Sequence, residues 1–147
     1  MVIGITGGIG SGKSTLSKLL RQHGYPVYDT DKEARRLQDE DVVLVQQIKS
    51  LFGENIYVDG KLNRPAVATL VFSNPELLQK LTTIVHPAVK QDFIDWKRNY
   101  NSEGLIFMES AVLFEGGFNL LTDKIILVTA SEDIRIQRVT KRDNISR

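Results

Sequence analysis

The sequence predicts an α/β protein in which helices flank a mostly parallel sheet. The first observation is the order of elements at the amino end: the apolar run 2–6 leads into a glycine-rich segment and then into a helical pattern over 14–23. The second is a pair of further apolar runs, 105–108 and 124–129, which follow a long block of helical character. Strands separated by helical segments are typical of α/β folds.

The glycine-rich segment fits the phosphate-binding pattern G-x-x-x-x-G-K-[ST]. Its glycines let several backbone N–H groups turn toward one point. Lys13 is expected to reach the β- and γ-phosphates of a nucleotide, and the Ser14 hydroxyl is expected to ligate Mg²⁺. We therefore predict a P-loop NTPase fold that binds ATP with Mg²⁺ through Gly8, Ile9, Gly10, Ser11, Gly12, Lys13, Ser14 and Thr15. The alternative is a glycine-rich turn that binds nothing.

The composition is that of an ordinary soluble globular protein. The 147 residues are 41% apolar and 25% charged, with a net charge of +1, which gives no general reason to expect nucleic acid or a membrane as partner. The chain has no cysteine, which excludes disulfides and thiolate metal sites. No apolar run approaches the roughly 20 residues that span a bilayer. The first strand begins at once, leaving no room for a signal peptide, so we expect a cytoplasmic enzyme.

Two carboxylates follow a second short strand, predicted at 25–28. Ligands of parallel sheets bind at the carboxyl ends of the strands, so Asp29 and Asp31 are candidates for a general base and for holding Mg²⁺ or its waters. The alternative is that one of them only caps the helix that starts near Lys32.

The block from Lys32 to Tyr100 shows no strong strand alternation and is predicted to be a helical insertion that receives a second substrate. An acidic cluster at 39–41 interrupts its first helical stretch and has the character of a solvated face. Asp59-Gly60 indicates a turn. The predicted helices that follow cover 65–72, 75–85, and a longer span from His86-Pro87 to about Tyr100.

The run 105–108 ends at Glu109, in the arrangement expected of an acidic residue that orients Mg²⁺ or its water. Residues 112–117 are predicted to form a loop or helical turn over the site, and 124–129 another buried strand. Ser131 is expected to cap a basic helix. Its Arg138 and Arg142 either close over ATP as part of a lid or lie on a basic surface helix.

Three functions fit these residues. The first is a metabolite kinase in which Asp31 takes the proton of an acceptor hydroxyl while Lys13, Mg²⁺ and lid arginines stabilise charge. The second is a GTPase switch, because 140–143 matches the guanine-reading pattern [NT]-K-x-D. However, that motif does not directly follow a strand here, and no D-x-x-G follows a strand. The third is a kinase with another small acceptor, such as a nucleoside monophosphate.

Several motifs along almost the whole chain resemble those of the dephospho-CoA kinase family. They are the P-loop, Asp29-Thr30-Asp31 with Ala34-Arg35, Phe52-Gly53, Asp59-Gly60, Leu62-Asn63-Arg64, Val71-Phe72, His86-Pro87, Leu113-Phe114-Glu115, and Gln137-Arg138 leading to Arg142-Asp143. The P-loop alone fits dozens of families, whereas this combination in this order is specific.

The resemblance implies ATP-dependent phosphorylation of the ribose 3′-hydroxyl of dephospho-CoA, with Asp31 as general base. It also implies that Lys13 and Arg138 are catalytic, that Arg142 contacts ATP from the lid, and that Arg64 and His86 line the acceptor. The corresponding organisation is a nucleotide-binding core at 1–31 and 103–137, an acceptor-binding region at 32–102, and the start of a lid at 138–147.

The chain departs from the family pattern in two places. Ala111-Val112-Leu113 replaces the usual Pro-Leu-Leu, so a looser turn is expected there. Family members also continue for several dozen residues beyond the lid, so we expect this chain to be truncated, with an effect on its activity. The sequence leaves the oligomeric state open.

Overall fold

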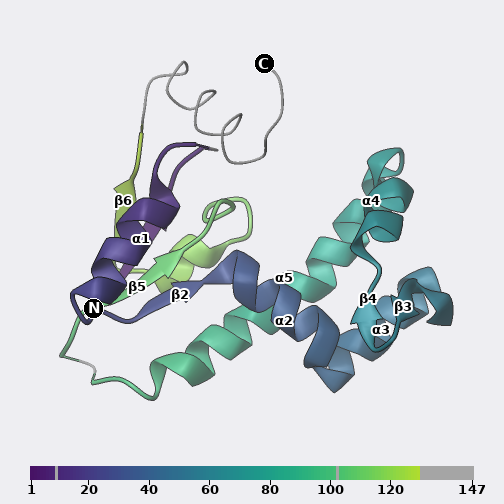
Figure 1. Cartoon of the computed structure of the whole chain (residues 1–147), viewed down its shortest axis with the longest axis horizontal. Helices are drawn as coiled ribbons and strands as arrows, with labels where there is room; N and C mark the ends of the chain where they lie inside the picture. Colours follow the sequence, from purple (N-terminus) through teal and green to yellow (C-terminus); the bar gives the residue numbers. More distant parts are fainter. Residues whose placement is uncertain (9, 102, 130–147) are drawn as a thin grey trace. The chain divides into compact units, whose positions relative to one another are not determined.

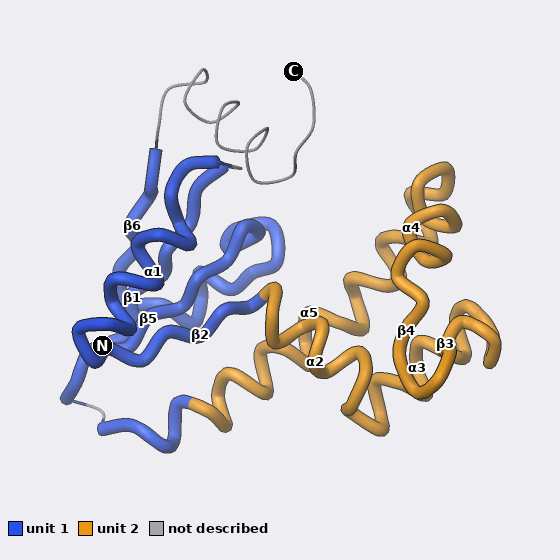
Figure 2. The backbone as a smooth tube through the Cα atoms, viewed as in Figure 1, with its two compact units in different colours: residues 1–30, 97–147 blue, residues 31–96 orange. Residues whose placement is uncertain are grey.

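The first of two compact units is built on a four-stranded parallel sheet (Figure 1, Figure 2). A computed structural model describes residues 1–8, 10–101 and 103–129. The strands are β1 (Val2–Thr6), β2 (Val27–Asp29), β5 (Ile106–Glu109) and β6 (Lys124–Leu127), in the order β2-β5-β1-β6. The prediction of an α/β fold with a parallel sheet is confirmed.

The two central strands carry much of this unit's core. Val2 and Ile5 of β1 are fully buried, and Ile106, Phe107 and Met108 of β5 are at most 5% exposed. The register pairs Val2 with Ile106 and Ile5 with Glu109. Because the strands are parallel, the residues that end them meet at one edge of the sheet.

One helix of the first unit connects β1 to β2, and a 3₁₀ turn precedes β6. Helix α1 (Lys13–Gln22) is followed by Gly24 in the left-handed region, at φ +86°. The amides of Gly24 and Tyr25 donate to the carbonyls of Arg21 and Leu20, which is the Schellman arrangement. Gly24 therefore ends the helix that the sequence predicted over 14–23. The 3₁₀ turn η2 covers Phe118–Leu121.

The prediction of a buried strand at 124–129 is wrong in burial and length. Strand β6 ends at Leu127, and its residues are exposed: Ile125 and Ile126 at 39% each and Leu127 at 66%. Within the described residues β6 pairs with β1 alone and lies at the edge of the sheet. An apolar run indicates a strand, but it does not reveal whether another element covers that strand.

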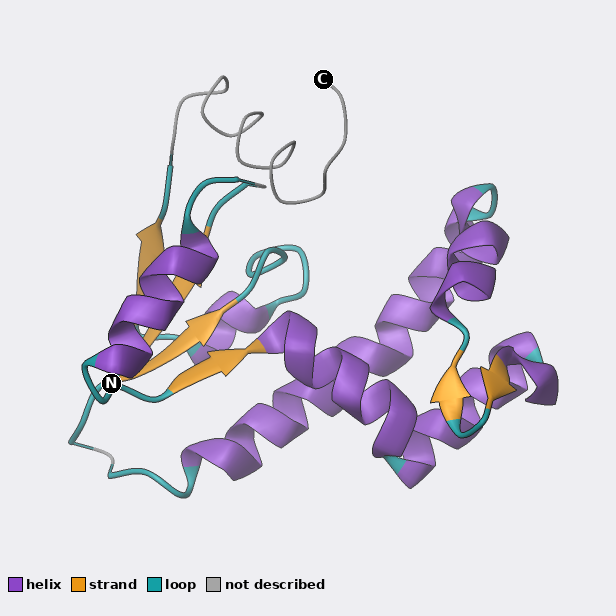
Figure 3. Ribbon diagram, in the orientation of Figure 1, coloured by secondary structure: helices purple, strands orange, loops and turns teal. Residues whose placement is uncertain are grey.

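The second unit, Asp31–Trp96, is mostly helical (Figure 3). Its elements are α2 (Thr30–Glu40, which begins one residue before the unit), α3 (Val42–Phe52), the 3₁₀ turn η1 (Glu54–Ile56), β3 (Tyr57–Val58), β4 (Lys61–Leu62), α4 (Arg64–Phe72) and α5 (Pro75–Lys97). Buried apolar side chains from α2, α3, β4 and the later helices form its core, among them Leu37, Leu44, Ile48, Leu62, Val67, Val89 and Phe93.

Side-chain caps define where three of these helices begin. Asp41 accepts the amide of Leu44 at 2.9 Å, which separates α3 from α2 within the acidic cluster. Asn63 and Asn74 make the same contact at the starts of α4 and α5. The predicted interruption near 39–41 is confirmed, but the prediction that the cluster is only a solvated face is wrong for Asp41.

Two predictions for this unit need correction. The predicted helices at 75–85 and from His86 onward are one continuous helix, α5, which runs through Pro87. The turn at Asp59-Gly60 was predicted, but the two short antiparallel strands that it joins, β3 and β4, were not. Strands of two residues are too short to show an alternating pattern.

Candidate active site

The segment between β1 and α1 has the backbone geometry of a phosphate-binding loop. Gly10 and Gly12 adopt positive φ values of 75° and 107°, which residues with a Cβ rarely adopt. The Ser11 amide donates to the Gly8 carbonyl at 3.1 Å, closing a turn inside the loop. Gly12 is the N-cap of α1, and no side chain caps this end of the helix. A helix amino end without a side-chain cap favours an anion.

The loop also contains a polar atom that needs a partner. Ser11 is 4% exposed, and its Oγ has no hydrogen-bond partner within the described residues. A Cβ added at Gly7 would lie 2.6 Å from this Oγ and 2.3 Å from the Val128 carbonyl oxygen, so only glycine fits there. A buried hydroxyl without a partner is costly. This loop therefore has the spare hydrogen-bonding capacity that fits a polyphosphate.

Glu109 ends β5 beside this loop and is tied to it by hydroxyl groups. Its Oε2 accepts from Ser17 Oγ at 3.0 Å, and its Oε1 accepts from Ser14 Oγ at 3.4 Å. The main-chain oxygen of Glu109 accepts from Thr30 Oγ1 at 3.0 Å. In the sheet register, Glu109 lies between Ile5 of β1 and Asp29 of β2. The carboxyl ends of three strands and the first two turns of α1 thus meet at Glu109.

The surroundings of Glu109 raise the pKa of its carboxyl group. Burial is the main cause, and the negative charge of Asp29 adds to it. The hydrogen bond from Ser17, the positive charge of Lys13 and the hydrogen bond from Ser14 act in the opposite direction. A cation bound beside Glu109 would favour its charged form, so this carboxylate fits a metal ion.

The donor set suits magnesium better than a metal held by protein ligands alone. Among residues 1–8, 10–101 and 103–129, no group of three or more histidine, cysteine, aspartate or glutamate side chains could hold a metal ion. Mg²⁺ in nucleotide sites is usually bound by one or two side-chain oxygens together with substrate phosphates and water. Ser14 and Glu109 provide such oxygens beside the loop.

The structure brings some predicted site residues together and leaves others outside its described part. Lys13, Ser14 and Thr15 form the first turn of α1. Asp31 is exposed in the first turn of α2, in the second unit. The described residues of the predicted loop set are Gly8, Gly10, Ser11 and Gly12. Ile9, Arg138 and Arg142, like the predicted lid at 138–147, lie outside the described residues.

Arg64 and His86, predicted from the resemblance to line the acceptor, lie in the second unit. Arg64 Nη2 donates to the main-chain oxygen of Arg35 at 2.9 Å and lies 3.5 Å from Asp39 Oδ2. Asp39 also accepts the Leu62 amide at 3.0 Å, so the acidic cluster contributes a second specific contact. His86 is half-buried in α5, where burial and then the charge of Lys90 lower its pKa.

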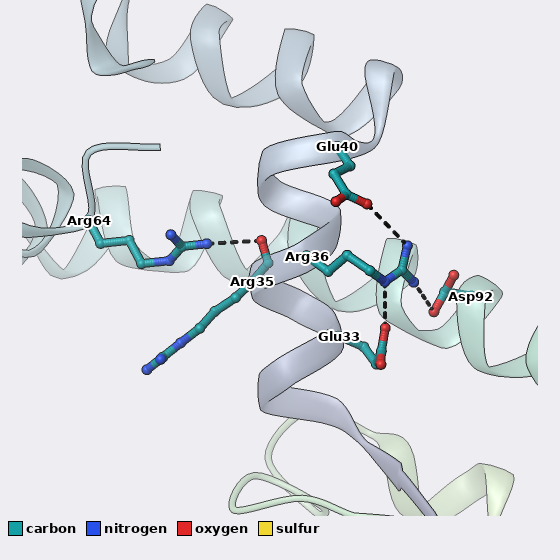
Figure 4. Close-up of polar contacts among 6 residues, drawn as sticks. All are labelled: Glu33, Arg35, Arg36, Glu40, Arg64 and Asp92. Atoms are coloured by element: carbon teal, nitrogen blue, oxygen red, sulfur yellow. Dashed lines mark hydrogen bonds and ion pairs between the residues drawn. The ribbon is translucent and has the colours of Figure 1, made fainter. Parts of the chain in front are cut away.

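A second arginine connects two helices of this unit. Arg36 Nε lies 2.6 Å from Glu33 Oε2, and its Nη2 lies 2.8 Å from Asp92 Oδ2 on α5 (Figure 4). Its Nη1 lies 3.9 Å from Glu40. Arg36 joins α2 to α5, whereas the side chain of Arg35 extends away from this network (Figure 4).

Sequence reasoning missed Ser17 and gave no role of its own to Thr30, although both are buried polar residues that contact Glu109. One signal was present for Ser17, a hydroxyl three residues after Ser14 on a helix. The helical spacing of Leu16, Leu19 and Leu20 indicates a helix but gives no sign of this contact: Leu19 is 49% exposed, whereas Ser17 is fully buried.

Comparisons with known proteins agree along the whole chain. Residues 1–147 match the family model described as dephospho-CoA kinase. The chain is 45% identical over 146 residues to a dephospho-CoA kinase of Porphyromonas gingivalis, covering 99% of this chain and 72% of that protein. It is 38% identical to a dephospho-CoA kinase of Chlorobaculum tepidum, covering 97% and 72%.

Two solved structures have a similar fold. A Thermus thermophilus protein, TT1252, superposes with a TM-score of 0.86 at 41% identity, covering 99% of this chain and 74% of that one. A dephospho-CoA kinase from Campylobacter jejuni superposes with a TM-score of 0.71 at 25% identity, with the same coverage.

Proposed function

This chain belongs to the dephospho-CoA kinase family, and we propose that it transfers the γ-phosphoryl group of ATP to the ribose 3′-hydroxyl of dephospho-CoA, giving CoA and ADP. The family catalyses the final step of coenzyme A biosynthesis. The observation that carries the proposal is the family match over residues 1–147, together with relatives at 38–45% identity. A GTPase switch or a kinase for another acceptor is not favoured by this match.

The loop and the first turn of α1 are proposed to bind the triphosphate. The positive φ of Gly10 and Gly12, the uncapped start of α1 and the buried Ser11 hydroxyl all support this role. Lys13 would place its positive charge against the β- and γ-phosphates. Arg138 and Arg142 are proposed to approach the nucleotide from a lid.

Mg²⁺ is proposed to be held by Ser14 and oriented through Glu109. When bound, the metal neutralises charge on the phosphates and keeps them aligned. The raised pKa of Glu109 and its contact with Ser14 support this assignment. The residues of this chain supply the oxygen atoms and the buried surroundings that make a cation favourable there.

Asp31 is proposed as the general base that accepts the proton of the acceptor hydroxyl. Its exposed location in the first turn of α2, two residues beyond the end of β2, leaves it accessible to a substrate. Arg64 and His86 are proposed to belong to the acceptor-binding region at 32–102. We also propose a cytoplasmic location, because the role of the family is biosynthetic.

A coupled assay of ADP release tests the function directly. The chain is mixed with ATP and Mg²⁺ and offered dephospho-CoA, adenosine or AMP. Release that depends on dephospho-CoA is expected, and equal or faster release with AMP would reject the acceptor. Lys13→Ala should weaken both ATP binding and turnover. Lys18→Ala, which removes an exposed lysine of the same helix, should leave both unchanged.

The assay is run in parallel on a longer version of the chain, carried to the length of its relatives. The longer version shows whether slow ADP release by this chain reflects its shorter length rather than a different acceptor. A longer version that also ignores dephospho-CoA would contradict the proposal. If GTP were preferred over ATP by tenfold or more, the nucleotide assignment would be wrong.

A further inference from the structure

Helix α1 buries a hydroxyl group against a carboxylate. Ser17 is fully buried, and its Oγ donates to Glu109 Oε2 at 3.0 Å. Serine is a poorer helix former than alanine or leucine, because its hydroxyl competes for backbone hydrogen bonds. The contact with Glu109 explains why serine occupies this position, since a buried carboxylate needs a hydrogen-bond donor.

Two serines donate hydrogen bonds to different oxygens of the Glu109 carboxylate. Ser14 and Ser17 are three residues apart and lie on the same side of α1. Ser17 contacts Oε2 at 3.0 Å, and the more exposed Ser14 contacts Oε1 at 3.4 Å. The shorter of the two contacts therefore comes from the buried serine.

Resting on the proposed function, we infer that Ser17 is a positioning residue for the magnesium site. Its hydroxyl holds Glu109 in the orientation that presents Oε1 beside Ser14. Ser17 contacts neither nucleotide nor metal in this scheme and acts through Glu109. Residues that orient metal-binding groups typically change metal affinity by 10- to 100-fold when they are replaced.

A purely structural role for Ser17 predicts a different outcome. In that case its replacement would lower thermal stability while leaving the response of the site to Mg²⁺ unchanged. The two roles are separable because Ser17→Ala removes a single oxygen from a helix interior, where alanine is well accepted. The helix is therefore expected to persist in the variant.

The experiment measures how strongly Mg²⁺ promotes ATP binding. The dissociation constant of ATP is determined by titration calorimetry with Mg²⁺ and again with EDTA, and the coupling is the ratio of the second to the first. We expect Ser17→Ala to lower this ratio by about tenfold or more, with the value in EDTA nearly unchanged. Thermal unfolding of each variant is recorded alongside.

Two further variants complete the design. Val2→Ala removes buried volume at the amino end of β1, away from the site, and should lose stability while keeping the wild-type ratio. Glu109→Gln should lower the ratio at least as far as Ser17→Ala does. In the double variant, Ser17→Ala should add no further loss, because its effect passes through Glu109.

The possible results show separately whether the proposed magnesium site and the proposed role of Ser17 hold. A wild-type ratio near one would reject the proposed magnesium site, and the inference with it. A large wild-type ratio that Ser17→Ala preserves would reject the inference alone. If Ser17→Ala fails to fold, Glu109→Gln decides: an unchanged ratio in that variant would overturn the role of Ser17.

Discussion

Asp29 and Asp31 are two residues apart but have different surroundings. Asp29 ends β2 opposite Glu109 and helps to raise the pKa of that carboxyl group. Asp31 is exposed in the first turn of α2. A general base must be reachable by the hydroxyl that it deprotonates, which favours Asp31.

Replacing Asp31 with asparagine should slow the reaction without releasing the nucleotide. Asp31→Asn removes the proton acceptor and keeps the size of the side chain, so kcat should fall by about 10²- to 10⁴-fold while ATP affinity stays nearly unchanged. Steady-state kinetics with dephospho-CoA and an ATP titration measure the two quantities. Asp59→Asn makes the same change in the β3–β4 turn and should behave as wild type. Near-normal turnover in Asp31→Asn would remove Asp31 from the mechanism.

His86 should make stability depend on pH below about 6.5. Burial and the charge of Lys90 lower the pKa of His86 in the folded chain, so the unfolded chain takes up the proton first as pH falls. The stability contributed by the neutral imidazole is therefore complete above about pH 6.5 and is lost as pH falls toward the lowered pKa. His86→Gln should remove the part of this acid-induced loss of stability that His86 causes.

Thermal unfolding between pH 8 and pH 5 measures this effect. The difference in melting temperature between His86→Gln and wild type should shift in favour of the variant as pH falls. His23→Gln, at the exposed end of α1, replaces the other histidine of the sequence and serves as the comparison variant. A difference that stays constant over the whole range would contradict the prediction.

At the scale of elements, the boundary between α2 and α3 depends on one side chain. Asp41 Oδ1 accepts the Leu44 amide at 2.9 Å. Asp41→Ala should lower the free energy of unfolding by about 1 kcal/mol, measured by urea denaturation. Asp41→Asn keeps an acceptor oxygen and should lose much less. Equal losses in both variants would attribute the effect to the charge of Asp41 rather than to its cap.

Helix α5 carries a proline in its interior. Pro87 has no N–H to donate to the Thr83 carbonyl, and prolines inside helices typically cost about 3 kcal/mol. Pro87→Ala should therefore raise the free energy of unfolding by about 1–3 kcal/mol in the same urea assay. Pro75→Ala, at the first residue of the helix, should not stabilise, because proline is favourable there. A less stable Pro87→Ala variant would show that the proline fits its surroundings.

Local signals in the sequence predicted the elements that lie beside the site. These signals are the apolar run at 2–6, the P-loop pattern with the helical pattern that follows it, and the apolar run before Glu109. Each depends on near neighbours, and they indicated β1, α1 and β5. Contacts between distant segments were not predicted: Ser17 and Thr30 became interpretable only when Glu109 lay beside them. Pro87 was predicted to start a helix because that is its usual place, whereas the surrounding helix continues through it.

At the scale of the molecule, the second unit is one continuous stretch of chain and the first is not. Residues 31–96 have a buried core of their own and internal contacts such as Arg36 to Asp92. The first unit joins β1 to β5 across more than 100 residues, with Val2 opposite Ile106.

No helix in the described residues is long and apolar enough to cross a membrane.

The second unit should fold when it is produced alone. A fragment of residues 31–96 is expected to give a helical circular dichroism spectrum and to unfold cooperatively on heating, because its core and caps are local. The fragment is small, so its stability should be modest. Arg36→Met in the fragment should lower the melting temperature, with a smaller effect at high salt. A fragment without helical signal would show that the unit needs the rest of the chain.

The separation of β1 from β5 also affects how the protein is made. On the ribosome, the apolar strand Val2–Thr6 emerges more than 100 residues before Ile106, which lies opposite Val2 in the folded sheet. At typical rates of synthesis, β1 waits roughly 5–20 seconds for β5. During this delay the nascent strand exposes apolar side chains that chaperones recognise, while residues 31–96 can already fold.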